Sequence, residues 1–320
     1  MARIGLISNL HSHQNRRGFA RIRDAAARHP EIAHVEIGRI EAVGEALRAF
    51  VREGIGVVAV NGGDGTVQAT LTALIDDLPS QARPRLAILP GGMTNLIAND
   101  VGLKGRRECA LSRLVAAVGG GEEGTEIVRP LISLRLAPGE VPVHGLFFGA
   151  AAFHRVILFA RQKVHPIGLD RVTALAATLA LVGARALFGR TEADGLFQGA
   201  PLALAIDGRE DPPVKTYFLV LATTLSRLAL GLSPFWGEGP GRCRYLAIES
   251  PPRRFRSALL PILRGRPRRW MTADGYASGR TDEITLRMTS PIVFDGQIFT
   301  PRADQPVTLR VEHQAVFLRC

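Results

Sequence analysis

The sequence predicts a two-domain α/β protein. Its first domain is expected to be a doubly wound, mainly parallel sheet, and its second an antiparallel β-sandwich. Three observations support this prediction. Apolar strand-like and helix-like segments alternate up to residue 118, strand-like segments dominate after residue 125, and two glycine-rich loops follow consecutive strands of the first half. Such alternation is typical of βαβ units, in which the strands run parallel.

The elements of the first half follow from apolar spacing and from helix-breaking residues. Pro30 and Gly54 end the first two predicted helices. Strands are expected at 3–9, 33–37, 57–60 and 86–89, and helices at about 17–29, 42–53, 67–77, 95–100 and 107–118. Because ligands of doubly wound sheets bind beyond the carboxyl ends of the strands, the loops 9–13, 62–66 and 90–95 are expected to form the site.

The glycine-rich turn after the third strand is the strongest local signal. It reads Asn61-Gly62-Gly63-Asp64-Gly65-Thr66. Glycines permit positive φ and let backbone N–H groups approach a phosphate, which a helix N-terminus also attracts. Asp64 adds an acid that a simple phosphate cradle does not need, which favours phosphoryl transfer. The alternative is a tight turn in which Asp64 or Thr66 only caps the following helix.

Five segments along the chain have the order and spacing of a known family. They are Ile7-Ser8-Asn9, Gly62-Gly63-Asp64-Gly65-Thr66, Leu89-Pro90-Gly91-Gly92-Met93-Thr94-Asn95, Gly145-Leu146-Phe147-Phe148-Gly149-Ala150 and Phe294-Asp295-Gly296-Gln297. Together they resemble the diacylglycerol kinase catalytic-domain family, which includes bacterial lipid kinases and sphingosine kinases and is distantly related to NAD kinases.

The resemblance implies an ATP-dependent kinase that phosphorylates the hydroxyl of a lipid such as diacylglycerol. Asp64 and Gln297 take the catalytic positions, and magnesium accompanies ATP. The implied nucleotide-binding residues are Asn9, Asn61, Gly62, Gly63, Asp64, Gly65, Thr66, Gly91, Gly92, Thr94 and Asn95.

Four positions depart from the family pattern. Gln297 replaces a glutamate thought to accept a proton, which a neutral amide cannot do near pH 7. Ala69 replaces a second glutamate, Met93 stands where threonine is usual, and Glu238 is the single acid of an expected acidic metal loop, so no protein metal ligand is predicted. Two alternatives therefore stay open: a non-catalytic regulatory relative that binds nucleotide or lipid, and a kinase of a soluble substrate such as NAD.

The domain boundary is expected at the glycine-rich stretch 119–124. The predicted domains are 1–125, which binds nucleotide, and 126–320, which binds the acceptor. The second carries a helical insertion at about 153–190, and its last strands return toward the first domain. Strands are expected at 127–136, 143–148, 203–207, 215–222, 244–248, 283–287, 292–294 and 307–311.

Composition limits the partners and the compartment. The 320 residues are 46% hydrophobic with a net charge of +11, which favours anionic partners, although no nucleic-acid module is recognised and nucleic acid is not expected. Three widely spaced cysteines and the lack of a signal-like leader favour the cytoplasm. The apolar segment 172–188 contains Gly183 and Arg185 and is interpreted as a buried helix. A homodimer is left open.

The segment 253–270 is a candidate surface. Arginines flank the apolar run from Ala258 to Leu263, and Trp270 follows the second arginine group. This pattern suits an interfacial segment on an anionic bilayer, which would place the protein at the inner membrane face. The alternative is a core-packed helix with solvated arginine ends.

Overall fold

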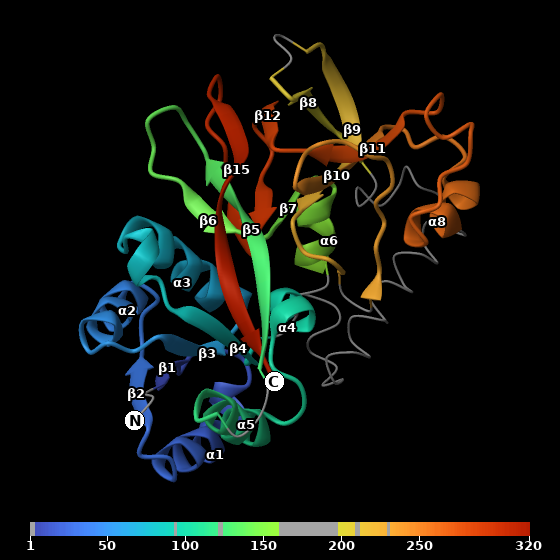
Figure 1. Cartoon of the computed structure of the whole chain (residues 1–320). Coiled ribbons are helices and arrows are strands. Elements are labelled where there is room, and N and C mark those ends of the chain that lie inside the picture. Colours follow the sequence, from blue (N-terminus) through green and yellow to red (C-terminus); the bar gives the residue numbers. More distant parts are fainter. Residues whose placement is uncertain (1–3, 93–94, 121–123, 160–197, 209–211, 229–230) are drawn as a thin grey trace. The chain divides into compact units, whose positions relative to one another are not determined.

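The computed structural model describes residues 4–92, 95–120, 124–159, 198–208, 212–228 and 231–320 (Figure 1). The chain divides into two compact units. Unit 1 consists of Met1–Leu131, Val143–Gly145 and His313–Cys320, and unit 2 consists of Ile132–Pro142 and Leu146–Glu312. By this division residues 126–131 and the last eight residues belong to unit 1, whereas the sequence analysis assigns them to the second domain.

Unit 1 alternates strands and helices along most of its length. Its elements are β1 (Ile4–Asn9), α1 (Asn15–Ala27), β2 (Ile32–Ile37), α2 (Ala42–Arg52), β3 (Val57–Gly62), α3 (Asp64–Asp76), η1 (Ser80–Ala82), β4 (Arg85–Pro90), α4 (Leu96–Val101), α5 (Arg107–Val118), β6 (Val143–Gly145) and the ends of β5 (Thr125–Arg135) and β15 (Pro306–Arg319).

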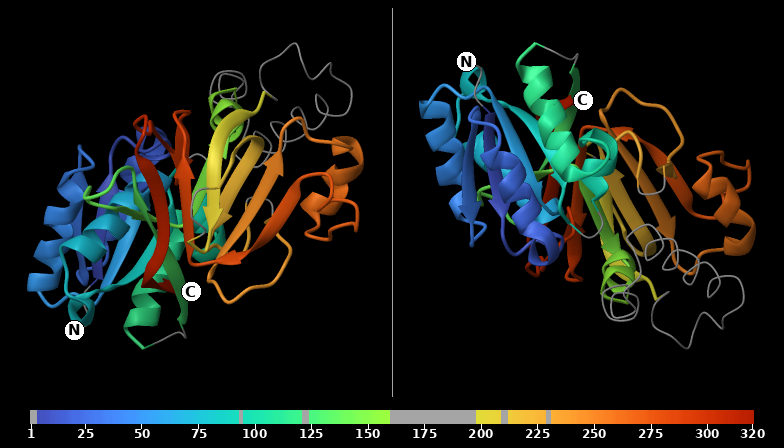
Figure 2. Two further views of the ribbon diagram at one scale, coloured as in Figure 1. Left: turned by 90° about the horizontal axis from the view of Figure 1, so that it is seen from above. Right: turned by 90° about the horizontal axis from the view of Figure 1, so that it is seen from below.

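The strands of unit 1 form a parallel sheet in the order β4-β3-β1-β2, and Phe317 of β15 pairs in parallel with Leu86 of β4. Helices α2 and α3 cover one face of this sheet, and α1 and α5 cover the other (Figures 1 and 2). The chain therefore leaves β1 and β3 toward opposite faces. The carboxyl ends of these two neighbouring strands form the topological switch point, where such sheets bind ligands.

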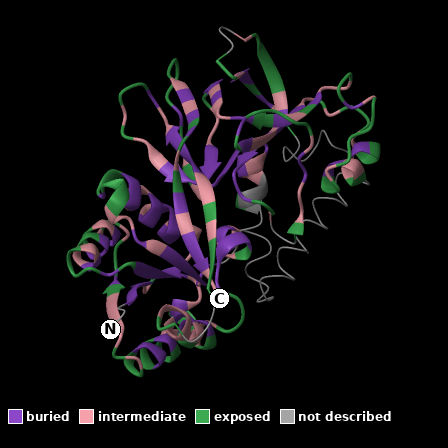
Figure 3. Ribbon diagram, in the orientation of Figure 1, coloured by how far each residue is buried: buried purple, intermediate pink, exposed green. Residues whose placement is uncertain are grey.

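Burial on both faces explains the apolar runs of the central strands. Every residue of β3 is buried, and its neighbours β1 and β4 are mostly buried as well (Figure 3). One face packs Leu6 and Ala59 against Ile22 of α1 and Leu111 of α5. Strands covered on both faces read as continuous apolar segments rather than as alternating ones.

Unit 2 is built mainly from antiparallel strands. Its elements are β7 (Phe147–Ala151), α6 (Phe153–Phe159), β8 (Ala200–Ile206), β9 (Val214–Thr223), β10 (Cys243–Glu249), α8 (Phe255–Leu263), β11 (Tyr276–Thr281), β12 (Glu283–Arg287), β13 (Ile292–Phe294) and β14 (Gln297–Phe299). The long strand β9 pairs antiparallel with β7, β8 and β10. The predicted fold class, parallel-rich first and antiparallel second, is confirmed.

The structure corrects several predicted strands. The strand expected at 143–148 is interrupted at Leu146, because the backbone N–H groups of Leu146 and Phe147 donate to the carboxylate of Asp295. Strands β11 and β14 were not predicted. The polar sequence of β11 lacks an apolar period, and β14 is only three residues long, which is too short to show one.

The predicted helical insertion lies largely outside the described residues, apart from α6 at its start. The segment 172–188 lies wholly outside them. Among the residues that the structure does describe, no helix is both long enough and apolar enough to cross a membrane.

Candidate functional site

Three loops meet at one edge of the unit 1 sheet. Strands β1, β3 and β4 are parallel neighbours, with Ser8 paired to Asn61 and Gly62 paired to Pro90. Their carboxyl ends are therefore adjacent, and the loops that follow Asn9, Gly62 and Pro90 leave the sheet side by side. Of the predicted nucleotide-binding residues, ten lie here, and Thr94 lies outside the described residues.

The glycines of the two glycine-rich loops permit a close contact between backbones. A Cβ atom on Gly92 would lie 2.5 Å from the Cα of Gly63, and one on Gly91 would lie 2.8 Å from the carbonyl oxygen of Gly62. The backbone N–H of Gly91 also donates to the Gly62 carbonyl at 3.0 Å. Any side chain at these positions would push the loops apart.

The positive φ that glycine permits is not used at these four positions. Gly63 is extended, with φ −89° and ψ 179°, and Gly62, Gly91 and Gly92 are not among the described residues with positive φ. The sequence pattern does not distinguish the two uses of glycine, because both require the absence of a Cβ atom.

Asp64 joins the two loops. It lies in the first turn of α3, and its carboxylate oxygens accept the backbone N–H groups of Leu96 and Ile97, each at 3.2 Å. Asp64 therefore caps α4, the helix after the second loop, because the first N–H groups of a helix have no partner within it. The N-cap residue of α3 is Gly63, which makes no side-chain hydrogen bond, and Asp64 and Thr66 lie within the helix.

Asn95 closes the second loop on itself. Its backbone is left-handed, with φ 48° and ψ 41°, a conformation that asparagine tolerates better than most residues. Its Oδ1 accepts the backbone N–H of Gly92 at 2.8 Å, and the side chain is 5% exposed. Asn95 therefore fixes the backbone of the glycine pair.

Side-chain amides connect the first loop to β1. The Nδ2 of Asn9 donates to the Oγ1 of Thr66 at 2.9 Å, and the Nδ2 of Asn15 donates to the carbonyl oxygens of Asn9 at 2.7 Å and Asn61 at 3.2 Å. The Nδ2 of Asn61 reaches Ser8 Oγ at 3.1 Å. These bonds hold the strand ends at a fixed separation.

Arg107 lies in this network, and the sequence analysis did not identify it. Its Nη1 donates to Asn15 Oδ1 at 2.6 Å and to Asn61 Oδ1 at 2.9 Å, and burial lowers the pKa of its guanidinium below the ordinary value. The residue is the first of α5. A positively charged side chain is unfavourable at a helix N-terminus, because the helix dipole is positive there. An arginine at the first position of a predicted helix is therefore the sequence signal that could have identified Arg107.

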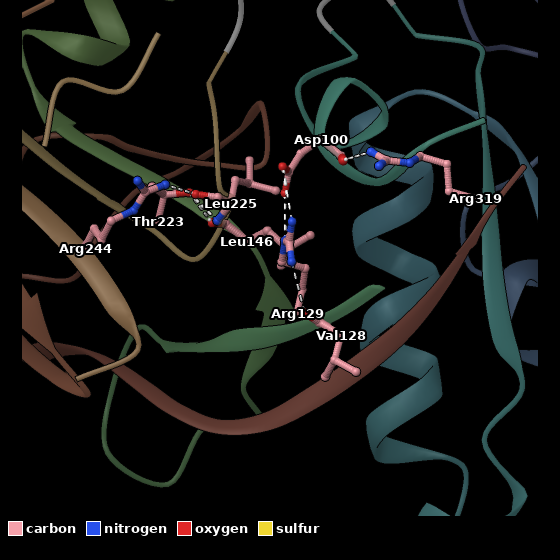
Figure 4. Close-up of polar contacts among 8 residues, drawn as sticks. All are labelled: Asp100, Val128, Arg129, Leu146, Thr223, Leu225, Arg244 and Arg319. Carbon is pink, nitrogen blue, oxygen red and sulfur yellow. Dashed lines mark hydrogen bonds and ion pairs between the residues drawn. The ribbon is translucent and has the colours of Figure 1, made fainter. Parts of the chain in front are cut away.

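Helix α4 is also held at its C-terminal end, within unit 1. The carboxylate of Asp100, 5% exposed, pairs with the Nε of Arg129 at 2.8 Å, and Arg319 donates to the Asp100 carbonyl at 3.3 Å (Figure 4). The six-residue helix is therefore anchored by Asp64 at one end and by Arg129 and Arg319 at the other.

Gln297 belongs to unit 2, at the start of β14. It follows Asp295 and Gly296, whose φ values of 45° and 80° form the hairpin turn that an Asp-Gly pair favours. The buried carboxylate of Asp295 accepts the N–H groups of Leu146 at 3.0 Å and Phe147 at 2.9 Å. Asp295 therefore holds the β13–β14 hairpin to β7 and places Gln297.

Arg244 ends the stretch 237–244, which takes the place of the acidic metal loop that the resemblance implies, and it contacts the chain before that stretch. Within unit 2, Arg244 donates to the Leu225 carbonyl, and Thr223 Oγ1 donates to the Leu146 carbonyl at 2.8 Å (Figure 4). Arg244 also donates to Ser233 Oγ at 3.1 Å. Glu238 is exposed. In the described part of the chain, no three His, Cys, Asp or Glu side chains are grouped closely enough to hold a metal ion.

Comparison with known proteins identifies relatives of this fold. Residues 3–120 match the family model for the diacylglycerol kinase catalytic domain. A crystal structure of a Bacillus anthracis str. Sterne protein, provisionally named a diacylglycerol kinase, has a TM-score of 0.63 and 16% identity, covering 99% of this chain and 94% of its own. A crystal structure of a diacylglycerol kinase from the same organism has a TM-score of 0.59 and 15% identity, covering 99% and 96%. At such identities the likeness concerns the fold. A comparison with curated protein sequences gives no match.

Proposed function

We propose that the protein is an ATP-dependent kinase of a lipid hydroxyl such as that of diacylglycerol, because residues 3–120 match the family model for the diacylglycerol kinase catalytic domain. The observation that carries the proposal is the contact between Gly63 and Gly92, closed by the carboxylate of Asp64. Two glycine-rich loops with no side chains in their contact, beside the start of α3, form a surface suited to phosphate.

The chain's own residues supply positioning and charge. Asn9, Asn61 and Thr66 fix the strand ends, and Asp64 fixes α4 relative to the first loop. Arg107 keeps a positive charge at this edge, because the pKa of an arginine stays above neutral even when burial lowers it. Phosphoryl transfer depends mainly on such positioning and on charge neutralisation.

Magnesium is the metal that the family resemblance implies. Asp64 is the single acid among the proposed nucleotide-binding residues, and both its oxygens accept backbone N–H groups. These residues fit an ion carried by the phosphates, with Asp64 as the one carboxylate nearby, rather than a site built wholly from protein ligands. When bound, magnesium neutralises charge on the phosphates.

The engagement of Asp64 and the neutrality of Gln297 favour a second candidate function. If neither of these two residues accepts a proton, the protein binds nucleotide or lipid and regulates another protein without transferring phosphate. An NAD-type soluble acceptor has no observation of this structure in its favour.

The first test measures phosphate transfer from ATP to diacylglycerol, monoacylglycerol, a sphingoid base and NAD. We expect transfer to a lipid, and we expect Asp64→Asn to lower kcat by about 100-fold or more, because an amide offers one acceptor oxygen to α4 and carries no charge. Asp77→Asn, at the other end of α3, is the matched control. Full activity of Asp64→Asn would refute the role of Asp64.

The second test distinguishes the two candidates through Gln297→Glu. If proton acceptance limits the wild-type rate, a glutamate here raises kcat by about tenfold or more and adds an acidic limb to the pH profile. A wild-type protein that ATP stabilises against heat, but that transfers phosphate to no acceptor before or after the substitution, is the non-catalytic relative.

A further inference from the structure

The segment 253–270 of unit 2 concentrates positive charge. It contains seven arginines, and no aspartate or glutamate occurs from residue 250 to residue 273, although the whole chain has a net charge of +11. All seven arginines are exposed: Arg253, Arg254, Arg256, Arg264, Arg266, Arg268 and Arg269. Within the described residues, Arg254 is the one member of this set with a carboxylate partner, Asp274 at 3.5 Å.

Helix α8 in this segment has two apolar faces. One face is packed within unit 2, since Ala258 and Ile262 are buried and the ring of Phe255 contacts Phe218 with centroids 5.4 Å apart. Leu260 and Leu263 lie on another face and are 53% and 36% exposed. The packed face explains why the helix folds here, but it does not explain why two leucines are exposed to solvent on the other face.

The exposed leucines share their face with an arginine. Arg256, Leu260 and Leu263 are spaced i, i+4 and i+7, which aligns them along one side of the helix. Figure 3 shows the exposed side of α8 in green. One arginine and two leucines therefore share the exposed side of α8.

The chain after α8 is held in a defined conformation. Gly265 has φ 61°, its N–H donates to the Ile262 carbonyl, and the N–H of Arg266 donates to the Pro261 carbonyl, which together form a Schellman motif. At the other end of the segment, the buried Tyr276 donates its hydroxyl to the Arg253 carbonyl at 2.6 Å. Trp270 contacts both Tyr276 and the guanidinium of Arg254.

We infer that the segment 253–270 is a docking surface for an anionic lipid bilayer. Lipid phosphates match the seven arginines, and the acyl boundary accepts Leu260 and Leu263 between them. A tryptophan beside such residues suits the headgroup layer. Nucleic acid would match the arginines but would leave both leucines exposed to water. The surface serves the proposed lipid kinase, yet its existence does not depend on the identity of the phosphate acceptor.

The test measures binding of the full chain to vesicles without nucleotide, so its result is separate from that of the kinase assay. The chain has two tryptophans, and Trp236→Phe leaves Trp270 as the only reporter. We expect binding to phosphatidylcholine vesicles that contain phosphatidylglycerol, no binding to phosphatidylcholine alone, and a shift of Trp270 emission to shorter wavelength.

Two variants separate the charged and apolar contributions. Arg264→Gln, Arg266→Gln and Arg269→Gln together should weaken binding on the order of 100-fold, because each arginine near an anionic surface contributes about fivefold. Leu260→Gln with Leu263→Gln should weaken it by at least about tenfold. The matched control replaces three exposed arginines in or beside α1 by glutamine: Arg17, Arg21 and Arg28. This variant should bind the vesicles as tightly as the wild type. Unchanged circular dichroism and thermal unfolding verify the fold of each variant.

Three results would overturn the inference. One is no binding to anionic vesicles. Another is an equal loss in the α1 control, which would mean that net charge alone acts. The third is a pair of observations: the leucine substitutions leave vesicle binding unchanged, and a short DNA duplex binds the protein in a way that requires the same arginines. That result would identify a nucleic-acid surface.

Discussion

Asp64 shows how one carboxylate connects two loops that are separate in the sequence. The resemblance to the lipid kinases implies a role beside phosphate, and the structure adds bonds to Leu96 and Ile97. These two roles compete for the same oxygens only in part, since each carboxylate oxygen has two lone pairs. Removing the charge would therefore disturb both the chemistry and the position of α4.

Arg107 carries a separable structural prediction. Asn15 and Asn61 are 3% and 0% exposed, so Arg107→Met would leave two buried carbonyl oxygens without this donor. We expect the free energy of unfolding to fall by about 2–4 kcal/mol, with partial recovery in Arg107→Lys. Urea denaturation measures this. The neighbouring Arg106 is exposed, and Arg106→Met should change stability little; equal effects of the two substitutions would contradict the assignment.

At the scale of elements, the site depends on how closely the turns after β3 and β4 approach each other. Each turn alone is compatible with many side chains. Their backbones meet at Gly63 and Gly92, and α4 is held at both ends, by Asp64 and by the pair of Asp100 with Arg129. The structural unit of the candidate site is therefore the pair of loops with α4, rather than either glycine motif.

Gly92→Ala tests this contact. Its Cβ would lie 2.5 Å from backbone rather than from a flexible side chain, so the loops must separate. We expect stability to fall by about 1–3 kcal/mol and the thermal stabilisation by ATP to be largely lost. Gly56→Ala, at the opposite end of β3, meets nothing within 4 Å and serves as the control. ATP stabilisation that survives Gly92→Ala would separate nucleotide binding from the loop contact.

At the scale of the whole molecule, the half-buried His34 and the buried His144 link stability to pH. Burial lowers the pKa of His34 and of His144 below the ordinary value of 6.5, and this effect outweighs the nearby carboxylates Glu36 and Asp76. His34 contacts Ser8 Oγ at 2.9 Å, next to the amide network. Both rings belong to unit 1 and favour the neutral form there.

We expect acid to destabilise the protein before its carboxylates titrate. Since the folded pKa values are lowered, the unfolded chain binds more protons; stability is complete above about pH 6.5 and falls as the pH drops toward the folded values. Urea unfolding at about pH 5.5 and about pH 7.5 measures the difference. His34→Gln with His144→Gln should reduce it. An unchanged difference would show that other groups control the acid response.

The sequence predicted the fold class, most strands and helices, and ten of the residues at the strand ends that the structure brings together. It did not predict Arg107, strand β11, the break at Leu146 or the reason for the glycines. Each of these depends on a partner far along the chain: Arg107 on Asn15, β11 on β10, Leu146 on Asp295, and Gly63 on Gly92.

What the sequence determined by itself is the alternation of strands and helices and the glycine-rich ends of β3 and β4, because apolar period and turn chemistry act over a few neighbouring residues. Tertiary structure alone decided that Asp64 caps α4, that the glycines serve contact rather than positive φ, and that Arg107 joins the site. The physical reason is that these hydrogen bonds and close contacts join segments that are far apart in the chain. The local sequence around each segment does not show which distant segment the fold brings into contact with it.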